Sequence, residues 1–297
     1  MDDRIVVSVE QARGLIAIQF PQWAALDIRP VELSGWDNRS FRLGDDMSIR
    51  MPSAARYVAQ VEKEHRWLPV LAPFLPFPIP APLALGQPGA DYPFCWSVYR
   101  WLKGEPLARQ LDSIDLSAIA VDVARFLNAL HRIHTLDGPL AGAHNFHRGG
   151  SLTVYDEEAR ASAARLADEV DHALAMQIWQ RALSSQWQGP AVWVHGDIAE
   201  GNLLVDDGRL SAVIDFGSSG VGDPSSDLIV AWNVLDAESR GVFRRALDLD
   251  DATWQRGRGW ALWKALIVLD AERGRNKKMA EWSRRTIREV FADHVEN

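Results

Sequence analysis

The chain has 297 residues, of which 47% are hydrophobic and 24% charged, a composition that excludes a disordered or collagen-like protein. With 32 Lys and Arg against 40 Asp and Glu, its net charge of −8 argues against duplex nucleic acid or an anionic membrane surface as the main partner. The single cysteine, Cys95, excludes an internal disulfide. The sequence shows no leader peptide and no run of 18 apolar residues, so we expect a cytoplasmic protein.

The first hundred residues predict a small β-rich region with two helices. Ser8 and Gln11 fit a capping box that opens a helix ended by Pro21, and an apolar stripe from Val58 predicts a second helix up to Pro69. Short strands, bounded by Gly, Asp and Asn turns or by prolines, are expected over 31–34, 39–43, 47–51, 83–85 and 94–101. The first three strands predict an antiparallel meander.

The sequence changes character after the segment 103–106, Lys-Gly-Glu-Pro, which has the composition of a hinge. We therefore place an N-terminal lobe at 1–102 and a C-terminal lobe at 103–297. Helical apolar spacing follows over 116–133, 156–188 and from Pro224 onward. One compact β insert interrupts these helices, with strands expected over 192–194, 202–205 and 210–214.

Two short segments contain the residues that could carry out catalysis: 195–202, His-Gly-Asp-Ile-Ala-Glu-Gly-Asn, and 214–217, Ile-Asp-Phe-Gly. If 205 pairs with 210 in a hairpin, Asn202 lies opposite Val213, and Asp215 lies two residues farther along. An amide and a carboxylate oxygen are hard donors that suit Mg²⁺, which keeps phosphate and water ligands as well. These segments predict a nucleotide–metal site, beside which Asp197 accepts a proton from an attacking hydroxyl.

These two motifs resemble those of the aminoglycoside phosphotransferase family, which is related to protein kinases. Further segments resemble that family's nucleotide-covering hairpin (31–50), interlobe strand and hinge (93–105), inserted loop (145–150) and post-metal turn (222–227). The resemblance implies an α+β, protein-kinase-like bilobal fold, with a small β-rich N-lobe and a larger, mainly helical C-lobe. It also implies transfer of the γ-phosphoryl group of ATP or GTP to a hydroxyl of an aminoglycoside or related antibiotic.

By the same resemblance, Asp197 is the catalytic base, and Asn202 and Asp215 bind magnesium. Arg50 stands where protein kinases carry the phosphate-binding lysine, and its forked cation can hold phosphate with a different geometry. The helix that follows offers either Glu64 or Glu62 as its carboxylate partner. The remaining nucleotide contacts are expected at Ser34, Gly35 and Asn38 of the covering hairpin and at Arg100 and Leu102 of the hinge segment.

The motifs leave other functions open. A metabolic kinase of the choline, homoserine or amino-sugar type would use the same residues. Arg50 in place of lysine is the main support for a nucleotide- or ligand-binding module without turnover. A metal-dependent phosphohydrolase is disfavoured because no D-x-D nucleophile motif ends a strand. In each case the partner is a small molecule, for which a cationic one suits the net charge, and the oligomeric state is left open.

Several neighbouring residues have structural interpretations. Asp223 before Pro224 suits a helix N-cap, Asp227 is expected to brace the catalytic loop, and His195 is expected to be a buried scaffold residue. Trp260 and Trp263 share a helix face, which is typical of core, with a place in the acceptor pocket as the alternative. Four histidines, at 131, 134, 144 and 147, lack further ligands at zinc spacing.

Overall fold

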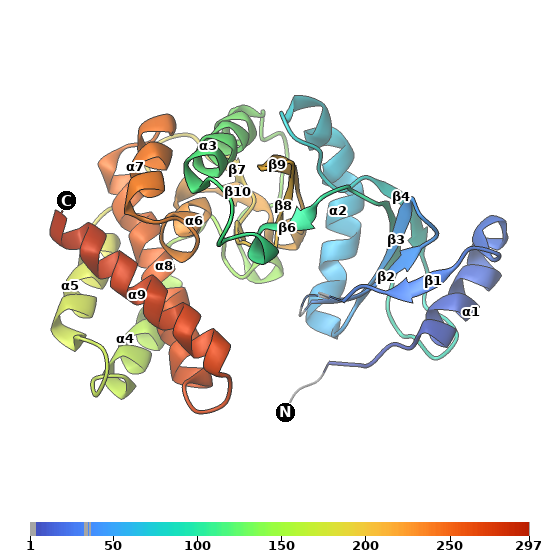
Figure 1. Cartoon of the computed structure of the whole chain (residues 1–297), viewed down its shortest axis with the longest axis horizontal. Coiled ribbons are helices and arrows are strands. Elements are labelled where there is room, and N and C mark those ends of the chain that lie inside the picture. Colours follow the sequence, from blue (N-terminus) through green and yellow to red (C-terminus); the bar gives the residue numbers. More distant parts are fainter. Residues whose placement is uncertain (1–3, 33–34, 36, 297) are drawn as a thin grey trace. The chain divides into compact units, whose positions relative to one another are not determined.

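A computed structural model gives the fold and describes residues 4–32, 35 and 37–296 (Figure 1). The chain divides into two compact units, the first made of Met1–Gly104 with Ala212–Gly217, and the second of Glu105–Ser211 with Ser218–Asn297. The boundary lies within the predicted hinge. The sequence had assigned 212–217 to the second lobe, whereas the structure groups this segment with the first unit. A hydrogen bond ties this segment to the first unit: the amide of Val213 donates to the carbonyl of Pro78 at 3.1 Å.

The first unit is built on one antiparallel sheet with the strand order β1-β2-β3-β5-β4. The strands are β1 (Ile28–Pro30), β2 (Asn38–Leu43), β3 (Met47–Pro52), β4 (Pro82–Gly86) and β5 (Trp96–Arg100). A strand was expected over 31–34, but β1 ends at Pro30 and residues 31 and 32 are not in a strand; 33–34 lie outside the described residues. The other four expected strands form within two residues of the predicted limits.

The two predicted helices of this unit are α1 (Val9–Gln19) and α2 (Val58–Leu71). Ser8 caps α1, and its side chain accepts a hydrogen bond from the Gln11 amide. The helix α2 continues two residues beyond the predicted end, with Pro69 in its last turn. The proline removes only the hydrogen bond of its own missing amide, and the Ala72 amide after it still bonds to the carbonyl of Leu68.

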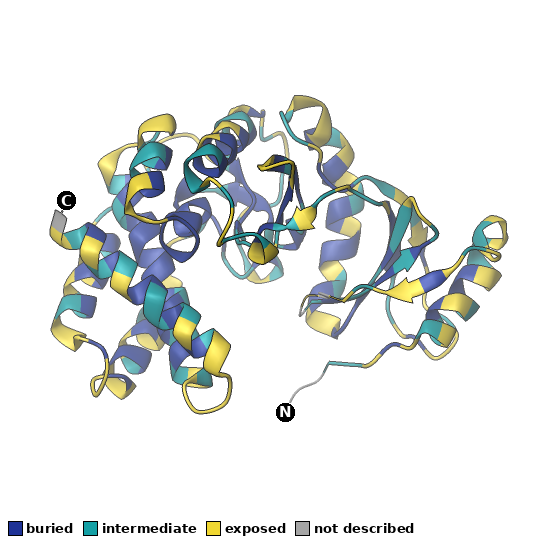
Figure 2. Cartoon of the chain, in the orientation of Figure 1, coloured by how far each residue is buried: buried dark blue, intermediate teal, exposed yellow. Residues whose placement is uncertain are grey.

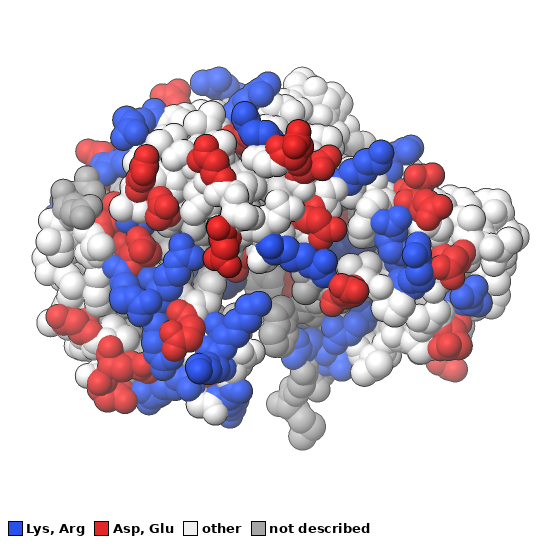
Figure 3. Space-filling model, in the orientation of Figure 1, with Lys and Arg blue, Asp and Glu red and all other residues white. Residues whose placement is uncertain are grey.

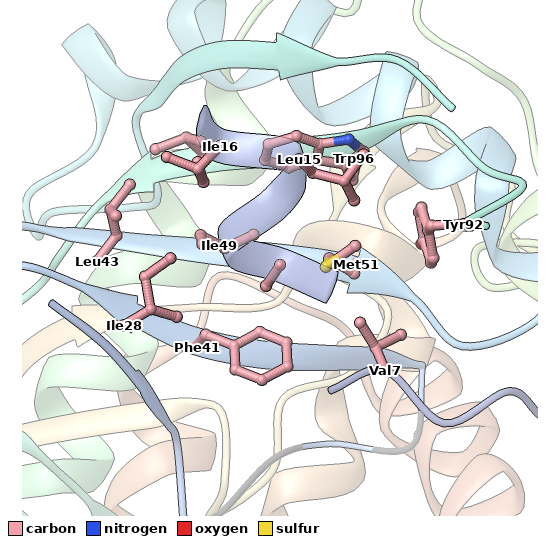
Figure 4. Close-up of a cluster of buried hydrophobic side chains, with 12 residues drawn as sticks. Val7, Leu15, Ile16, Ile28, Phe41, Leu43, Ile49, Met51, Tyr92 and Trp96 are labelled. Atoms are coloured by element: carbon pink, nitrogen blue, oxygen red, sulfur yellow. The ribbon is translucent and has the colours of Figure 1, made fainter. Parts of the chain in front are cut away.

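Alternate residues of the strands form an apolar core on one sheet face. Phe41, Ile49 and Trp96 pack there with Leu15 and Ile16 of α1 (Figure 4). Because side chains alternate along a strand, the residues between them point to the opposite face. On that face, polar residues of β3 and β5 contact the helix α2.

The second unit is mainly helical, as predicted. Its helices are α3 (Leu116–Arg132), α4 (Asp156–Arg165), α5 (His172–Leu183), α6 (Val230–Asn233), α7 (Ala237–Ala246), α8 (Asp251–Glu272) and α9 (Lys277–Glu296). The stretch 156–188, expected as one helical region, contains two helices, with Asp171 as the N-cap of the second. The long helix α8 contacts α4, α5 and α9, and most of it is buried (Figure 2).

Two small sheets lie between these helices, where the sequence predicted one β insert. The strand β7 (Val192–Val194) pairs antiparallel with β10 (Gly220–Gly222). The other sheet has the order β6-β8-β9, with β6 (Glu105–Pro106), β8 (Leu203–Asp206) and β9 (Arg209–Val213). The expectation of a single insert was therefore wrong, because β7 pairs with a strand that follows the hairpin. The strand β10 was not predicted, because two of its three residues are glycines, which are uncommon in strands.

Basic and acidic side chains occur side by side on the visible face of both units, as the mixed composition predicts (Figure 3). Among the residues that the structure describes, no helix combines the length and apolar character needed to cross a bilayer.

Candidate active site

In the first unit, Arg50 of β3 links two carboxylates. Its Nη2 lies 2.8 Å from Asp215 Oδ1, and its Nη1 lies 3.5 Å from Glu64 Oε1 on α2. Burial alone would lower the pKa of Arg50, but the charges of Glu64 and Asp215 raise it above its ordinary value. Of the two glutamates proposed as partners, Glu64 is buried and makes this contact, whereas Glu62 is exposed. Arg50 thus forms a charged triad with both carboxylates.

Two further residues hold this triad. The hydroxyl of Tyr99 on β5 donates a hydrogen bond to Glu64 Oε2, and burial together with the Glu64 charge raises the pKa of Tyr99. Lys63, also on α2, is buried, and its Nζ donates to the carbonyl of Gly217 at 2.6 Å. Burial lowers the pKa of Lys63 to about 8, although Glu64 and Asp215 act in the opposite direction. Consecutive residues of α2 therefore anchor Arg50 and the segment that carries Asp215.

The backbone around Asp215 is constrained. Asp215 has φ +67°, in the left-handed region that few residues other than glycine adopt. Two residues later, a β-carbon at Gly217 would meet Gln60 Oε1 of α2 at 2.7 Å. Gln60 also donates to Asp37 Oδ2 at 3.2 Å. Close packing against α2, together with the Arg50 contact, holds Asp215 in this unusual conformation.

In the second unit, Asp227 braces the loop that carries Asp197. Its carboxylate accepts hydrogen bonds from the amides of His195 at 3.0 Å and Gly196 at 2.6 Å, and His131 Nε2 lies 3.4 Å away. His195 is fully buried, and its Nδ1 accepts from the Asp197 amide at 3.2 Å. The structural interpretations of Asp227 and His195 are confirmed.

Asp223 has the capping role that the sequence indicated. Its carboxylate accepts from the Ser225 amide at 2.9 Å, and Arg256 of α8 donates to it at 2.7 Å. The short helical turn Pro224–Ile229 that it caps also contains Asp227. The cap therefore fixes the residue that braces the loop carrying Asp197.

The two carboxylate oxygens of Asp197 have different neighbours. Asn202 Nδ2 donates to Oδ2 at 3.1 Å and to the Asp197 carbonyl at 2.9 Å. Lys264 Nζ of α8 lies 3.7 Å from Oδ1. Burial would raise the pKa of Asp197, but the charges of Lys264, Arg148 and His195 and the Asn202 hydrogen bond together lower it. Asp197 is therefore ionised at neutral pH, as a proton acceptor must be.

Arg148 was not predicted as a site residue, although the sequence singled out its loop. It is 4% exposed and lies over the rings of Trp260 and Trp263, 4.8 and 5.0 Å from their centroids. The ring of Tyr155 stacks on the ring of Trp263, with 3.9 Å between the ring centroids. The Arg148 nitrogens Nε and Nη1 have no hydrogen-bond partner among the described residues. Trp260 and Trp263 are themselves buried, which favours the core interpretation over a place in an acceptor pocket.

The remaining predicted nucleotide contacts lie at strand ends of the first unit. Asn38 begins β2 opposite Pro52, and Gly35 is exposed, while Ser34 lies outside the described residues. Arg100 ends β5 with an exposed side chain, and Leu102 follows it, half-buried. The structure thus groups Arg50, Glu64 and Asp215 in one unit and Asp197 and Asn202 in the other.

The predicted metal ligands retain suitable oxygen atoms. The Asn202 amide nitrogen is used by Asp197, which leaves its carbonyl oxygen as a donor, and Asp215 meets Arg50 through Oδ1 only. No group of three or more His, Cys, Asp or Glu that suits a metal occurs in the described part of the chain. Each residue thus offers an oxygen donor of the kind that suits Mg²⁺, which commonly binds few protein ligands and completes its shell with water and phosphate oxygens.

Comparisons with known proteins identify the family of the chain. Residues 27–260 match the phosphotransferase enzyme family. The chain is 28% identical over 124 residues to an aminoglycoside 3'-phosphotransferase of Escherichia coli, and over 129 residues to one of Salmonella typhimurium. Each match covers 41% of this chain and 45% of the relative, so the similar segment spans less than half of those enzymes.

Solved structures share the fold over nearly the whole chain. An aminoglycoside 2'-phosphotransferase-IIIa in complex with GDP has a TM-score of 0.72 at 16% identity, covering 97% of this chain and 100% of that one. A macrolide 2'-phosphotransferase of Brachybacterium faecium has a TM-score of 0.61 at 20% identity, covering 94% and 97%. The predicted α+β, kinase-like fold is confirmed, and the family match over most of the sequence shows that the chain belongs to the phosphotransferase enzyme family.

Proposed function

We propose that this protein transfers the γ-phosphoryl group of ATP or GTP to a hydroxyl of a small molecule, with an aminoglycoside or related antibiotic as the first candidate acceptor. The observation that carries the proposal is the ionised Asp197, held by Asn202 on a loop that Asp227 braces. The family match supports the reaction class, and the names of the relatives support the acceptor class.

In the proposed reaction, Asp197 accepts a hydrogen bond from the acceptor hydroxyl and takes its proton. The new bond forms between the acceptor oxygen and the γ-phosphorus, while the bond to the bridging oxygen of the departing diphosphate breaks. Arg50 holds phosphate oxygens of the nucleotide, and Glu64 orients Arg50. Asn202 and Asp215 would hold Mg²⁺, which supplies charge neutralisation for the phosphates when it is bound.

The test is a screen with radiolabelled ATP or GTP and Mg²⁺ against aminoglycosides, macrolides and amino alcohols. Asp197→Ala should lower turnover at least about 100-fold, because a general base of this kind contributes that much or more. The control is Asp248→Ala, since the Asp248 side chain is 88% exposed. Unchanged turnover in Asp197→Ala would contradict the assignment.

The same screen separates the alternatives. Product from an amino alcohol alone would indicate a metabolic kinase. Thermal stabilisation by the nucleotide with Mg²⁺, without phosphorylated product, would indicate a binding module. Release of phosphate in the absence of any acceptor would indicate a phosphohydrolase.

A further inference from the structure

We propose that Lys264 is a catalytic residue that binds the phosphoryl group while it is transferred to the acceptor hydroxyl. The proposal rests on the proposed function, and it adds a charged residue on α8 that neither sequence motif contains. Lys264 and Asp197 both belong to the second unit, where they form an ion pair.

The two oxygens of the Asp197 carboxylate have different neighbours. Oδ2 is occupied by the amide of Asn202, which leaves Oδ1 as the oxygen for an acceptor hydroxyl. Lys264 Nζ lies 3.7 Å from this same Oδ1, an ion-pair distance that is too long for a hydrogen bond. Lys264 therefore lies on the side of Asp197 where the acceptor would bind.

The burial pattern of α8 makes Lys264 exceptional. Every residue from Arg256 to Leu266 is buried except Lys264, whose side chain is 33% exposed. Its charged group lies at the one position of this stretch that a ligand can reach. The four-carbon side chain is flexible, so Nζ can move by several ångströms without a change in the helix.

Arg148 adds a second cation beside Asp197. The guanidinium is held by the Trp260 and Trp263 rings, and its positive charge contributes to lowering the pKa of Asp197. The other carboxylate that acts on Arg148 belongs to Asp227, which already accepts two backbone amides. Lys264 and Arg148 therefore both supply positive charge at Asp197, which offsets the carboxylate charges and lowers the cost of bringing a phosphoryl group close.

Reaction geometry brings the phosphoryl group near Lys264. An acceptor oxygen bonded to Oδ1 would lie about 2.7 Å from it, and the phosphorus about 3 Å from that oxygen before reaction. As the acceptor O–P bond forms and the bond to the leaving diphosphate breaks, the proton passes to Asp197. Lys264 stays protonated and hydrogen-bonds to the oxygens of the phosphoryl group, where it stabilises the charge of the transition state.

The experiment compares Lys264→Met, Lys264→Arg and the control Lys278→Met, an exposed position of α9. With the acceptor found by the screen, Lys264→Met should lower kcat about 100-fold while the acceptor KM and the melting temperature stay close to wild type. Lys264→Arg should recover at least about a tenth of the activity, since it retains a cation. If Lys264→Met fails to fold, Lys264→Gln replaces it.

A second measurement does not depend on turnover. Melting temperatures are recorded with ADP or GDP and Mg²⁺, then with aluminium fluoride added as a mimic of the phosphoryl group. Wild type and Lys278→Met should gain stability from the fluoride, and Lys264→Met should lose most of that gain. Near-wild-type kcat in Lys264→Met, an undiminished fluoride effect, or no rescue by arginine would overturn the proposal. Absence of product from wild type with every acceptor would instead contradict the proposed function.

Discussion

Replacing Gly196 with alanine should destabilise the second unit and lower turnover. Gly196 precedes Asp197 and has φ +82°, where a β-carbon is strained. That β-carbon would lie 2.5 Å from the carbonyl oxygen of Ser218 and 2.9 Å from Arg148 Cβ. Since the first of these atoms belongs to the backbone, the loop itself must shift to admit the methyl group.

The expected loss of stability has two contributions. The left-handed backbone conformation costs about 1–2 kcal/mol for a residue with a β-carbon. Overpacking a tight site costs about 1–3 kcal/mol more. The sum, about 2–5 kcal/mol, is a large part of the ~5–15 kcal/mol net stability of a typical folded protein. A shift of the loop would also lengthen the hydrogen bond from the Gly196 amide to Asp227, and Asp197 would move with it.

Two other glycines separate the contributions. Gly208 has φ +72°, but a β-carbon there would meet no atom of the described residues within 4 Å, so Gly208→Ala measures the backbone cost alone. Gly201 lies in open space without a positive φ, so Gly201→Ala should cost close to nothing. Urea unfolding followed by circular dichroism gives the three free energies, and phosphoryl transfer gives turnover. We expect the free energy of unfolding to fall most for Gly196→Ala and more for Gly208→Ala than for Gly201→Ala.

Equal losses for Gly196→Ala and Gly208→Ala would refute the steric argument. They would show that Ser218 and Arg148 move aside at no cost, so that the close approach does not constrain the loop. Full turnover in a destabilised Gly196→Ala would refute the link between this contact and the position of Asp197.

Two further predictions concern buried polar groups. Asp227→Ala removes the acceptor of the buried His195 and Gly196 amides and should lower the free energy of unfolding by about 1–3 kcal/mol for each amide. The control Asp248→Ala, at an exposed position, should change it by less than about 0.5 kcal/mol. Equal effects of the two substitutions in urea unfolding would contradict the bracing role of Asp227. Lys63 has a pKa of about 8 in the folded protein, below its ordinary 10.5, so between these pH values the unfolded chain binds more protons and stability rises with pH. Relative to Lys63→Met, wild type should gain up to about 1.4 kcal/mol per pH unit in this window, and parallel stability curves from pH 7 to 10.5 would show that Lys63 keeps its ordinary pKa.

Local patterns predicted much of the fold. The cap at Ser8, the helical spacing of α3 and four of the five expected strands of the first unit depend on residues a few positions apart, and the structure has them. The errors occurred where partners are distant. The strand β1 ends at Pro30, before the expected segment 31–34, and β7 pairs with β10 across more than twenty residues.

The candidate site was likewise predicted in part from the sequence. The motifs at 195–202 and 214–217 indicated the residues that we propose for phosphoryl transfer, because residue type and spacing can be read from the sequence. Which glutamate meets Arg50 depended on burial, since Glu62 and Glu64 are equivalent as residue types and lie on different sides of α2.

The sequence alone predicted the fold class and most of the helices and strands, and it indicated the residues that we propose for phosphoryl transfer. Tertiary structure decided that 212–217 packs with the first unit, that Arg148 fills the space beside Gly196, and that Lys264 faces Asp197. Arg50 and Asp215 are 165 residues apart in the chain. Contacts over such separations depend on how whole elements pack, whereas helix periodicity, caps and turns depend on neighbours within about four residues.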